Sequence, residues 1–151
     1  AALLLMRHDD QRRKLRDNPD LINSMIEEVL RFDGPTNALV RVVAQDHELH
    51  GRQLHQGERV FVMVNSANRD SRVFESADEF DISRQRNRHL TFGQGIHLCL
   101  GAKLAREEGR IAVQRLFDRF PDLALDPDNP PAWLDAMVPR GTRHLPVRLK
   151  G

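Results

Sequence analysis

The sequence predicts an α+β fold that is mainly helical, and three observations lead to this class. A stripe of apolar residues at helical spacing runs through residues 22–30. Stretches typical of strands, separated by glycines, occupy residues 39–64. The elements follow one another as helices, strands, a long loop, a helix and strands, unlike the alternating order of a parallel α/β sheet. With 151 residues, 40% hydrophobic and 30% charged, the chain has the size and composition of one globular domain.

The beginning of the chain is predicted to be helical. Residues 1–7 read as the end of a helix, and AALLLM has no capping residue before it, so we expect the chain to begin inside that helix. A processed natural terminus is the alternative. A short helix is expected over residues 9–16. Asn18-Pro19 then marks a helix start, because a capping side chain precedes a proline, which the first helical turn accepts. The next helix ends at Gly34-Pro35 and carries the apolar stripe of Ile22, Met25, Ile26, Val29 and Leu30.

Three stretches after this helix are typical of strands. They cover residues 39–43, the segment around 49–54, and residues 60–64, with Gly51 and Gly57 supplying turns between them.

The remainder combines a loop, a helix and a strand. Residues 65–90 are polar and rich in Arg, Asp, Ser and Asn, which predicts a long loop with one helical turn. A long helix is expected from about Cys99 to Phe120, where Pro121 stops it. The turn-rich connector DPDNPP follows, and residues 145–149 are predicted as the last strand.

The charge balance and cysteine content bound the class of protein. The net charge is +1, so we expect neither nucleic acid nor a membrane as a partner. One cysteine cannot close an intramolecular disulfide, which fits a cytoplasmic protein. The apolar run at residues 1–6 is far too short to span a bilayer.

The stretch FGQGIHLCLG, residues 92–101, contains the single cysteine, Cys99, among three glycines. Cys99 lies at the start of the predicted long helix, where free backbone N–H groups and the helix dipole favour a thiolate. Glycines let the backbone bend sharply or approach something large and flat. A metal ligand and a nucleophile are both compatible with this pattern. The alternative is a buried cysteine that acts as a small hydrophobic residue.

Two of the chemical alternatives lack supporting residues. A nucleophile needs a base, and His97 is two residues away, a spacing that seldom brings two side chains together. Zinc needs about four ligands, but there is no second cysteine, and His47, His50 and His55 have no distinctive spacing. A single thiolate with an open opposite face suits haem iron.

The same stretch is similar to the haem-binding signature of the cytochrome P-450 family, F-x-x-G-x-H/R-x-C-x-G. Its defining positions are filled by Phe92, Gly95, His97, Cys99 and Gly101. LAREEGRIAV resembles the family's helix after the cysteine, IEEVLRFDGP its earlier E-x-x-R helix, ANRD and FESADEFDISR its meander, and RGTRHLPVRL its terminal hairpin. The resemblance is to soluble bacterial members and covers essentially residues 1–151. It implies the C-terminal haem-binding half of the P-450 fold, with small β-sheet elements and a C-terminal β-hairpin.

The resemblance implies haem as the cofactor and Cys99 as the proximal iron ligand. Phe92 would pack beside the sulfur and the porphyrin. The loop and the following helix would approach the ring closely at three small residues, Gly93, Gly101 and Ala105.

Two further residues would each bond a haem propionate, His97 and Arg41. The alternatives are an exposed loop histidine and a charge on an edge strand. Residues 36–39 would face the substrate by analogy.

The E-x-x-R pattern occurs twice, at Glu28/Arg31 and at Glu107/Arg110, and either could be an exposed ion pair. Arg31 falls opposite the apolar stripe on a helical wheel, so periodicity predicts that it is solvated. The resemblance implies instead that Glu28 and Arg31 form the structural pair that locks the meander. The family's third partner often comes from a P-x-x-F segment. Here residues 77–80 read ADEF, without the proline and with no arginine before Phe80, so this partner is left unassigned.

A possible docking face for an electron donor lies on the long helix. Lys103, Arg106 and Arg110 share one side by helical spacing. The resemblance implies an acidic iron–sulfur or flavin protein as the partner. A solvated face beside Glu107 and Glu108 is the alternative.

The resemblance implies a monooxygenase that uses haem, dioxygen and two electrons to hydroxylate a small organic substrate. Family members are far longer, and this chain starts just beyond the oxygen-activating segment with its acid–threonine pair. We therefore expect no catalytic residue in residues 1–151, which would be part of a larger single domain. The alternative is a truncated, non-catalytic fragment that binds haem weakly or not at all and self-associates through exposed apolar surface.

Overall fold

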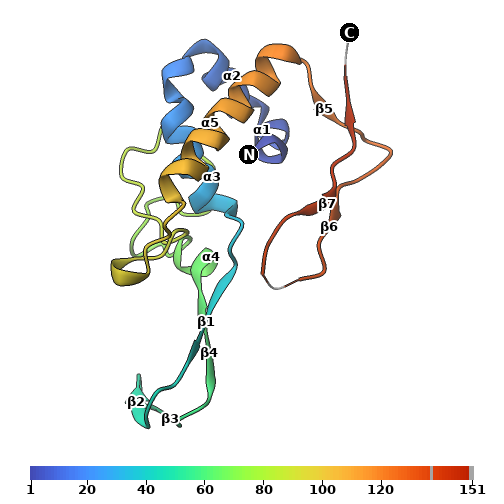
Figure 1. Ribbon diagram of the computed structural model, residues 1–151. Coiled ribbons are helices and arrows are strands. Elements are labelled where there is room, and N and C mark those ends of the chain that lie inside the picture. The colour runs from blue at the N-terminus through green and yellow to red at the C-terminus, as the bar shows by residue number, and fades with distance from the viewer. Residues whose placement is uncertain (137, 150–151) are drawn as a thin grey trace.

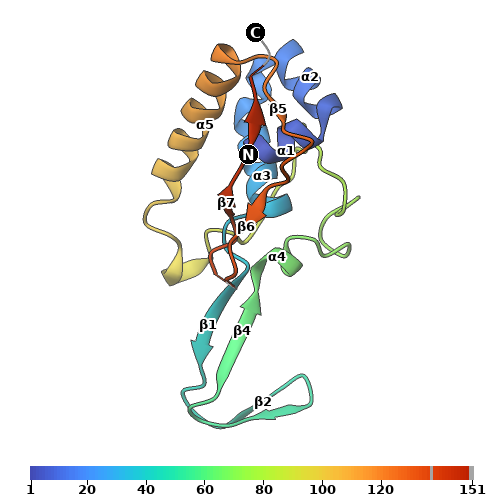
Figure 2. The ribbon, with the colours of Figure 1, turned by 90° about the vertical axis from the view of Figure 1, so that its right-hand side faces the viewer.

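The computed structural model describes residues 1–136 and 138–149 and confirms the α+β, mainly helical class (Figures 1 and 2). The helices lie together, the ladder of β1 and β4 extends away from them with β2 and β3 at its end, and the C-terminal strands run alongside the helices. None of the helices within the described residues is both long and apolar enough to cross a bilayer. The helices are α1 (Ala2–Arg7), α2 (Asp9–Asp17), η1 (Pro19–Leu21), α3 (Ile22–Asp33), α4 (Val64–Ala67), η2 (Gly95–His97) and α5 (Ala102–Arg119).

The strands form small antiparallel pairs: β1 with β4, β2 with β3, β5 with β8 and β6 with β7. In the longest ladder Ala38 lies opposite Met63 and Val42 opposite Arg59. The strands are β1 (Ala38–Val42), β2 (His47–Leu49), β3 (Arg52–Leu54), β4 (Arg59–Met63), β5 (Ala124–Leu125), β6 (Ala132–Trp133), β7 (Thr142–His144) and β8 (Val147–Arg148).

The core forms where α1, α3 and α5 meet the polar loop. The apolar stripe of α3 faces this core, as its spacing predicts. Helices α3 and α5 approach closely at Gly109, where an added Cβ would lie 3.2 Å from Cδ1 of Ile26. The buried cluster consists of Leu4, Leu5, Met25, Ile26, Val29, Phe80, Ile82 and Val113.

Several element boundaries differ from the sequence prediction. The long helix begins at Ala102 with Gly101 as its N-cap, so Cys99 lies in the preceding loop and not in the helix. The segment around 49–54 is a hairpin of two strands, because His50 and Gly51 adopt positive φ between them. The predicted last strand, 145–149, is reduced to Val147–Arg148. It and its partner β5 are two residues long, too short to leave a periodic pattern.

The largest departure from periodicity is Arg31, which is fully buried although the helical wheel predicts a solvated residue. Its guanidinium makes a two-pronged pair with Glu28, with N–O distances of 2.8 and 2.7 Å. The remaining three N–H groups donate to the backbone carbonyls of Asn68, Ala77 and Glu79, at 3.0, 2.8 and 2.9 Å. All five donors of Arg31 are therefore satisfied without water, which is what lets a charge be buried here.

The carboxylate of Glu28 is also fully buried, and it accepts hydrogen bonds from several residues of the polar loop. It accepts hydrogen bonds from the backbone N–H of Asp81 (3.0 Å), from Nε of Arg84 (3.1 Å) and from Nδ2 of Asn87 (3.0 Å). Arg84 therefore joins Glu28 and Arg31 as the third partner that the sequence left unassigned, and it follows Phe80 in the chain instead of preceding it. Residues 65–90 form a long loop with one helical turn, as predicted, and these bonds give it a fixed path.

Replacement of Arg31 by Met should lower the free energy of unfolding by about 3–5 kcal/mol, because it leaves a buried carboxylate and three carbonyls short of donors. Arg110→Met is the matched control, since Arg110 and Glu107 have the same spacing but form an exposed pair. Its cost should be below about 1 kcal/mol. Urea unfolding measures both, and equal costs for the two variants would contradict the prediction.

Candidate functional site

The loop from Phe92 to Cys99 closes on itself through its backbone. The N–H of Cys99 donates to the carbonyl of Phe92 at 2.8 Å, and the carbonyl of Cys99 accepts from the N–H of Ala102 at 3.2 Å. Gly93 has φ +73°, and an added Cβ there would lie 3.1 Å from the carbonyl oxygen of His97, so this turn requires glycine. Cys99 is exposed, which rules out the alternative of a buried hydrophobic cysteine.

Exposed apolar residues lie close to Cys99 in the sequence. Ile96 and Leu100 are 98% and 102% exposed, and Leu98 and Leu104 are 60% and 61% exposed. A single sulfur donor among exposed apolar residues of one loop fits a large, flat, apolar group that carries a metal. Within the described residues, no three His, Cys, Asp or Glu side chains gather into a cluster that could hold a metal ion. The donor chemistry of the loop therefore fits haem iron better than a multi-ligand zinc site.

Most of the residues predicted for the site lie in or beside this loop. Phe92 is half-buried under Arg106, and Gly101 and Ala105 begin α5, where the N–H of Ala105 donates to Gly101 at 2.9 Å. His97 is exposed in η2.

Arg41 lies apart from the loop, on the β1–β4 ladder opposite Val60. It is exposed, and its guanidinium donates to the carbonyl of Val40 at 2.9 Å. Among the described residues it has no carboxylate partner, so its charge is available to an anionic ligand.

Two of the three cations predicted as a docking face on α5 are paired in the structure. Arg106 turns toward α3 and makes a two-pronged pair with Glu27, at 2.6 and 2.9 Å. Arg110 pairs with Glu107 at 2.9 Å. Lys103 is exposed. The docking of an electron donor on this face stays a prediction.

A buried amide connects Arg31 to the start of the cysteine loop. Asn68 is fully buried, and its carbonyl accepts from Arg31. Its side chain donates to Oγ1 of Thr91 at 2.9 Å and accepts from the N–H of Leu90 at 2.7 Å. The hydroxyl of Thr91 donates to the carbonyl of Leu30 at 2.6 Å. Sequence analysis missed Asn68 and Thr91, since neither belongs to a periodic pattern or to the cysteine signature.

The structure also reveals Glu27 and His89 next to the loop. Burial alone would raise the pKa of Glu27, but hydrogen bonds from His89 and Arg106 and the charge of Arg106 outweigh it and lower the pKa to about 2. The signal in the sequence was the first glutamate of IEEVLR, which the E-x-x-R pattern does not use.

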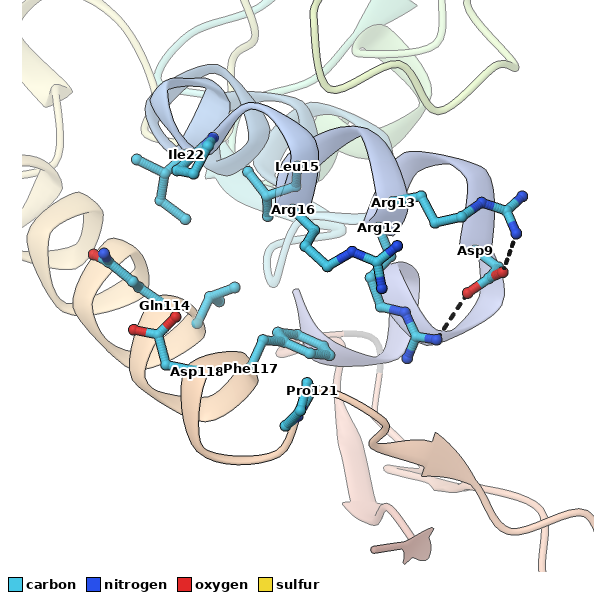
Figure 3. A pocket seen from close by; sticks show the side chains of 12 residues that line it. Asp9, Arg12, Arg13, Leu15, Arg16, Ile22, Gln114, Phe117, Asp118 and Pro121 are labelled. Carbon is cyan, nitrogen blue, oxygen red and sulfur yellow. Dashed lines mark hydrogen bonds and ion pairs between the residues drawn. The ribbon is translucent and has the colours of Figure 1, made fainter. Parts of the chain in front are cut away.

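A cavity of about 580 Å³ lies elsewhere, between α2 and the end of α5 (Figure 3). Its walls combine apolar side chains such as Phe117 with Arg12 and Arg13, both of which pair with Asp9. None of the residues predicted for the site lines it.

Glu27→Gln should flatten the pH dependence of stability on the acid side. The pKa of Glu27 is lowered in the folded state from its usual 4.5 to about 2. Its stabilising contribution is therefore complete above the usual pKa and is lost as the pH falls through about 2. The unfolding free energy of the parent protein should fall toward that of the variant between about pH 5 and pH 2. Urea unfolding across this range measures it, and a constant difference would contradict the assignment.

Comparisons with known proteins identify the family of the chain. The family model for cytochrome P450 matches residues 4–141. The biotin biosynthesis cytochrome P450 of Bacillus subtilis is 46% identical over 125 residues, which cover 83% of this chain and 32% of that protein. The 6-deoxyerythronolide B hydroxylase of Saccharopolyspora erythraea is 40% identical over 152 residues, covering 100% of this chain and 38% of that protein.

Solved structures give the same result. The cytochrome P450 PksS of the Bacillus subtilis bacillaene polyketide synthase superposes with a TM-score of 0.94 at 39% identity, covering 99% of this chain and 39% of that one. The chain spans about a third of the length of the curated relatives that it matches. The chain belongs to the cytochrome P450 family, whose cofactor is haem.

Proposed function

We propose that this chain supplies the haem-binding part of a haem-thiolate monooxygenase, with Cys99 as the proximal iron ligand. The observation that carries the proposal is the exposed thiol of Cys99, presented by a loop that closes through its own backbone and carries exposed apolar residues. Haem bound there supplies the iron that activates dioxygen, and a thiolate ligand favours O–O cleavage. The residues of this chain bind and orient the cofactor, and none of them is assigned a catalytic step.

The residues around Cys99 would hold the ring in place. Phe92 would pack beside the sulfur and the porphyrin, and the small residues Gly93, Gly101 and Ala105 would let the loop and α5 approach it. His97 and Arg41, both exposed, would each bond one propionate. Burial of Ile96, Leu98, Leu100 and Leu104 by haem and by the rest of the protein would remove exposed apolar surface.

The substrate in this proposal is a small organic molecule, and residues 36–39 would face it. The segment just before them is fixed, because Pro35 accepts the N–H of Arg140 at 2.8 Å and Asp33 pairs with the Arg140 side chain. Two electrons would come from an iron–sulfur or flavin protein, with Lys103, Arg106 and Arg110 of α5 as the docking face. We propose residues 1–151 as part of a larger single domain, and a cytoplasmic location, which suits the exposed free thiol of Cys99.

The decisive measurement is the spectrum of the reduced, haem-loaded protein under carbon monoxide, with Cys99→Ala beside it. Thiolate ligation should give a strongly red-shifted Soret band in the parent protein, and the variant should lose it because the sulfur donor is gone. Since Cys99 is exposed, the variant should keep the fold, and circular dichroism checks this.

A parent protein without the red-shifted band would contradict thiolate ligation by this chain. It would favour the second candidate function, a non-catalytic fragment that binds haem weakly or not at all. The strongly exposed Ile96 and Leu100 would then promote self-association.

Arg41→Ala should release haem about tenfold faster than the parent protein, because a charge-assisted bond to a propionate is lost. Arg59→Ala is the matched control. Arg59 is an exposed arginine of the same ladder, but it pairs opposite Val42 and so lies on the other face. Transfer of haem to excess apomyoglobin measures the rates. Equal rates for both variants would show that the Arg41 charge does not hold the cofactor.

A further inference from the structure

Resting on the haem-thiolate function proposed above, we propose that Glu27 is a positioning residue for the loop that carries Cys99. Its carboxylate acts through two side chains, His89 and Arg106, which together fix Phe92. Phe92 in turn fixes the backbone of Cys99. Glu27 touches neither the sulfur nor the cofactor site, so its effect is on the geometry of the ligand loop.

The contacts of Glu27 join three segments that are far apart in the sequence. Oε1 and Oε2 accept from Nε and Nη2 of Arg106 in α5, at 2.6 and 2.9 Å. Oε2 also accepts from Nε2 of His89, at 3.1 Å, in the segment leading to the cysteine loop. Arg106 has a second anchor in its own helix, where Nη1 donates to the carbonyl of Ala102 at 3.3 Å. The carboxylate therefore ties α3 to both sides of the loop.

His89 is held in one orientation by both ring nitrogens. Its side chain is 3% exposed. Nδ1 accepts the backbone N–H of Thr91 at 3.2 Å, so the ring proton lies on Nε2, where it is donated to Glu27. The imidazole cannot rotate without breaking one of these bonds. Glu27 thus fixes the backbone at Thr91, the residue just before Phe92.

Phe92 contacts both of these side chains and is hydrogen-bonded to the backbone of Cys99. The Arg106 guanidinium carbon lies 4.6 Å from the centroid of the Phe92 ring. The centroid of the His89 ring lies 6.0 Å from the same point. The carbonyl of Phe92 accepts the N–H of Cys99 at 2.8 Å. A shift of Phe92 therefore moves the backbone of the ligand itself. Groups that orient a metal ligand tune the bond between ligand and metal.

The neighbouring Glu28 serves a different part of the fold. Adjacent residues of a helix point about 100° apart, and Glu28 bonds to Arg31, Asp81, Arg84 and Asn87 of the helix and the polar loop. Glu27 contacts neither this pair nor the loop segment 68–84. Its removal should loosen the cysteine loop and leave the polar loop in place.

The test uses the haem-loaded protein and four variants: Glu27→Gln, Glu27→Asp, Arg106→Lys and the control Glu107→Gln. The first readout is the rate at which the red-shifted carbon monoxide band converts to the unshifted form that has lost thiolate ligation. Glu27→Gln should speed this conversion about tenfold, and Glu27→Asp should restore part of the loss. Glu107→Gln should match the parent protein, because the hydrogen bonds of the Glu107 carboxylate within the described part of the chain go to Arg110 at the surface.

The second readout is hydrogen exchange in the haem-loaded protein, which separates positioning from general destabilisation. Exchange should accelerate in residues 89–101 of Glu27→Gln and stay unchanged in residues 70–84. Equal acceleration in both segments, or none in residues 89–101, would overturn the proposal. If Glu27→Gln does not fold, Arg106→Lys decides, since it keeps the charge but loses the two-pronged pair.

The two proposals fail in different ways. A parent protein without a Cys99-dependent band overturns the haem-thiolate function and with it the role of Glu27. The parent protein can instead show that band while a folded Glu27→Gln variant has the same conversion rate and the same hydrogen exchange. This result overturns the role of Glu27 alone.

Discussion

The buried pair of Glu28 and Arg31 is the interaction on which the site depends, because it ties the long loop of residues 65–90 to α3. Phe80 and Ile82 of this loop reach the hydrophobic core, and the polar remainder of the loop needs other anchors. The guanidinium of Arg31 donates hydrogen bonds to three carbonyls of the loop. The carboxylate of Glu28 accepts hydrogen bonds from Arg84 and Asn87. Both charges lie in the protein interior at the cost of desolvation, and their complete hydrogen bonding offsets that cost.

Two routes connect α3 to the cysteine loop. One starts at Arg31 and passes through the buried amide of Asn68 to Thr91, and the other starts at Glu27. Both routes meet at the start of the loop, where Phe92 and Cys99 share a backbone hydrogen bond. The thiol is thus exposed at its tip while its backbone is anchored from behind. A side chain anchored in this way can meet a bound group without having to be ordered by it.

The sequence predicted the parts of the fold that rest on local patterns. The stripe of α3, the stop at Pro121 and the cysteine signature depend on neighbours in the chain, and all were found where expected apart from a three-residue shift at the start of α5. The burial of Arg31 could not be predicted from periodicity, because it depends on acceptors 37 to 48 residues away. The same is true of Arg106. Its helical spacing predicts a solvated side chain, but the side chain turns toward α3 and pairs with Glu27.

The way in which Arg31 binds the polar loop leaves the loop tolerant of changes in its sequence. Arg31 binds the loop through main-chain carbonyls of Asn68, Ala77 and Glu79, and every residue type carries such a carbonyl. Side chains at positions such as Asp78, which is 91% exposed, are free of this task. The loop can therefore vary in surface charge and shape while its path stays the same. The constraint on this loop thus falls on its main chain and not on the identity of its exposed side chains.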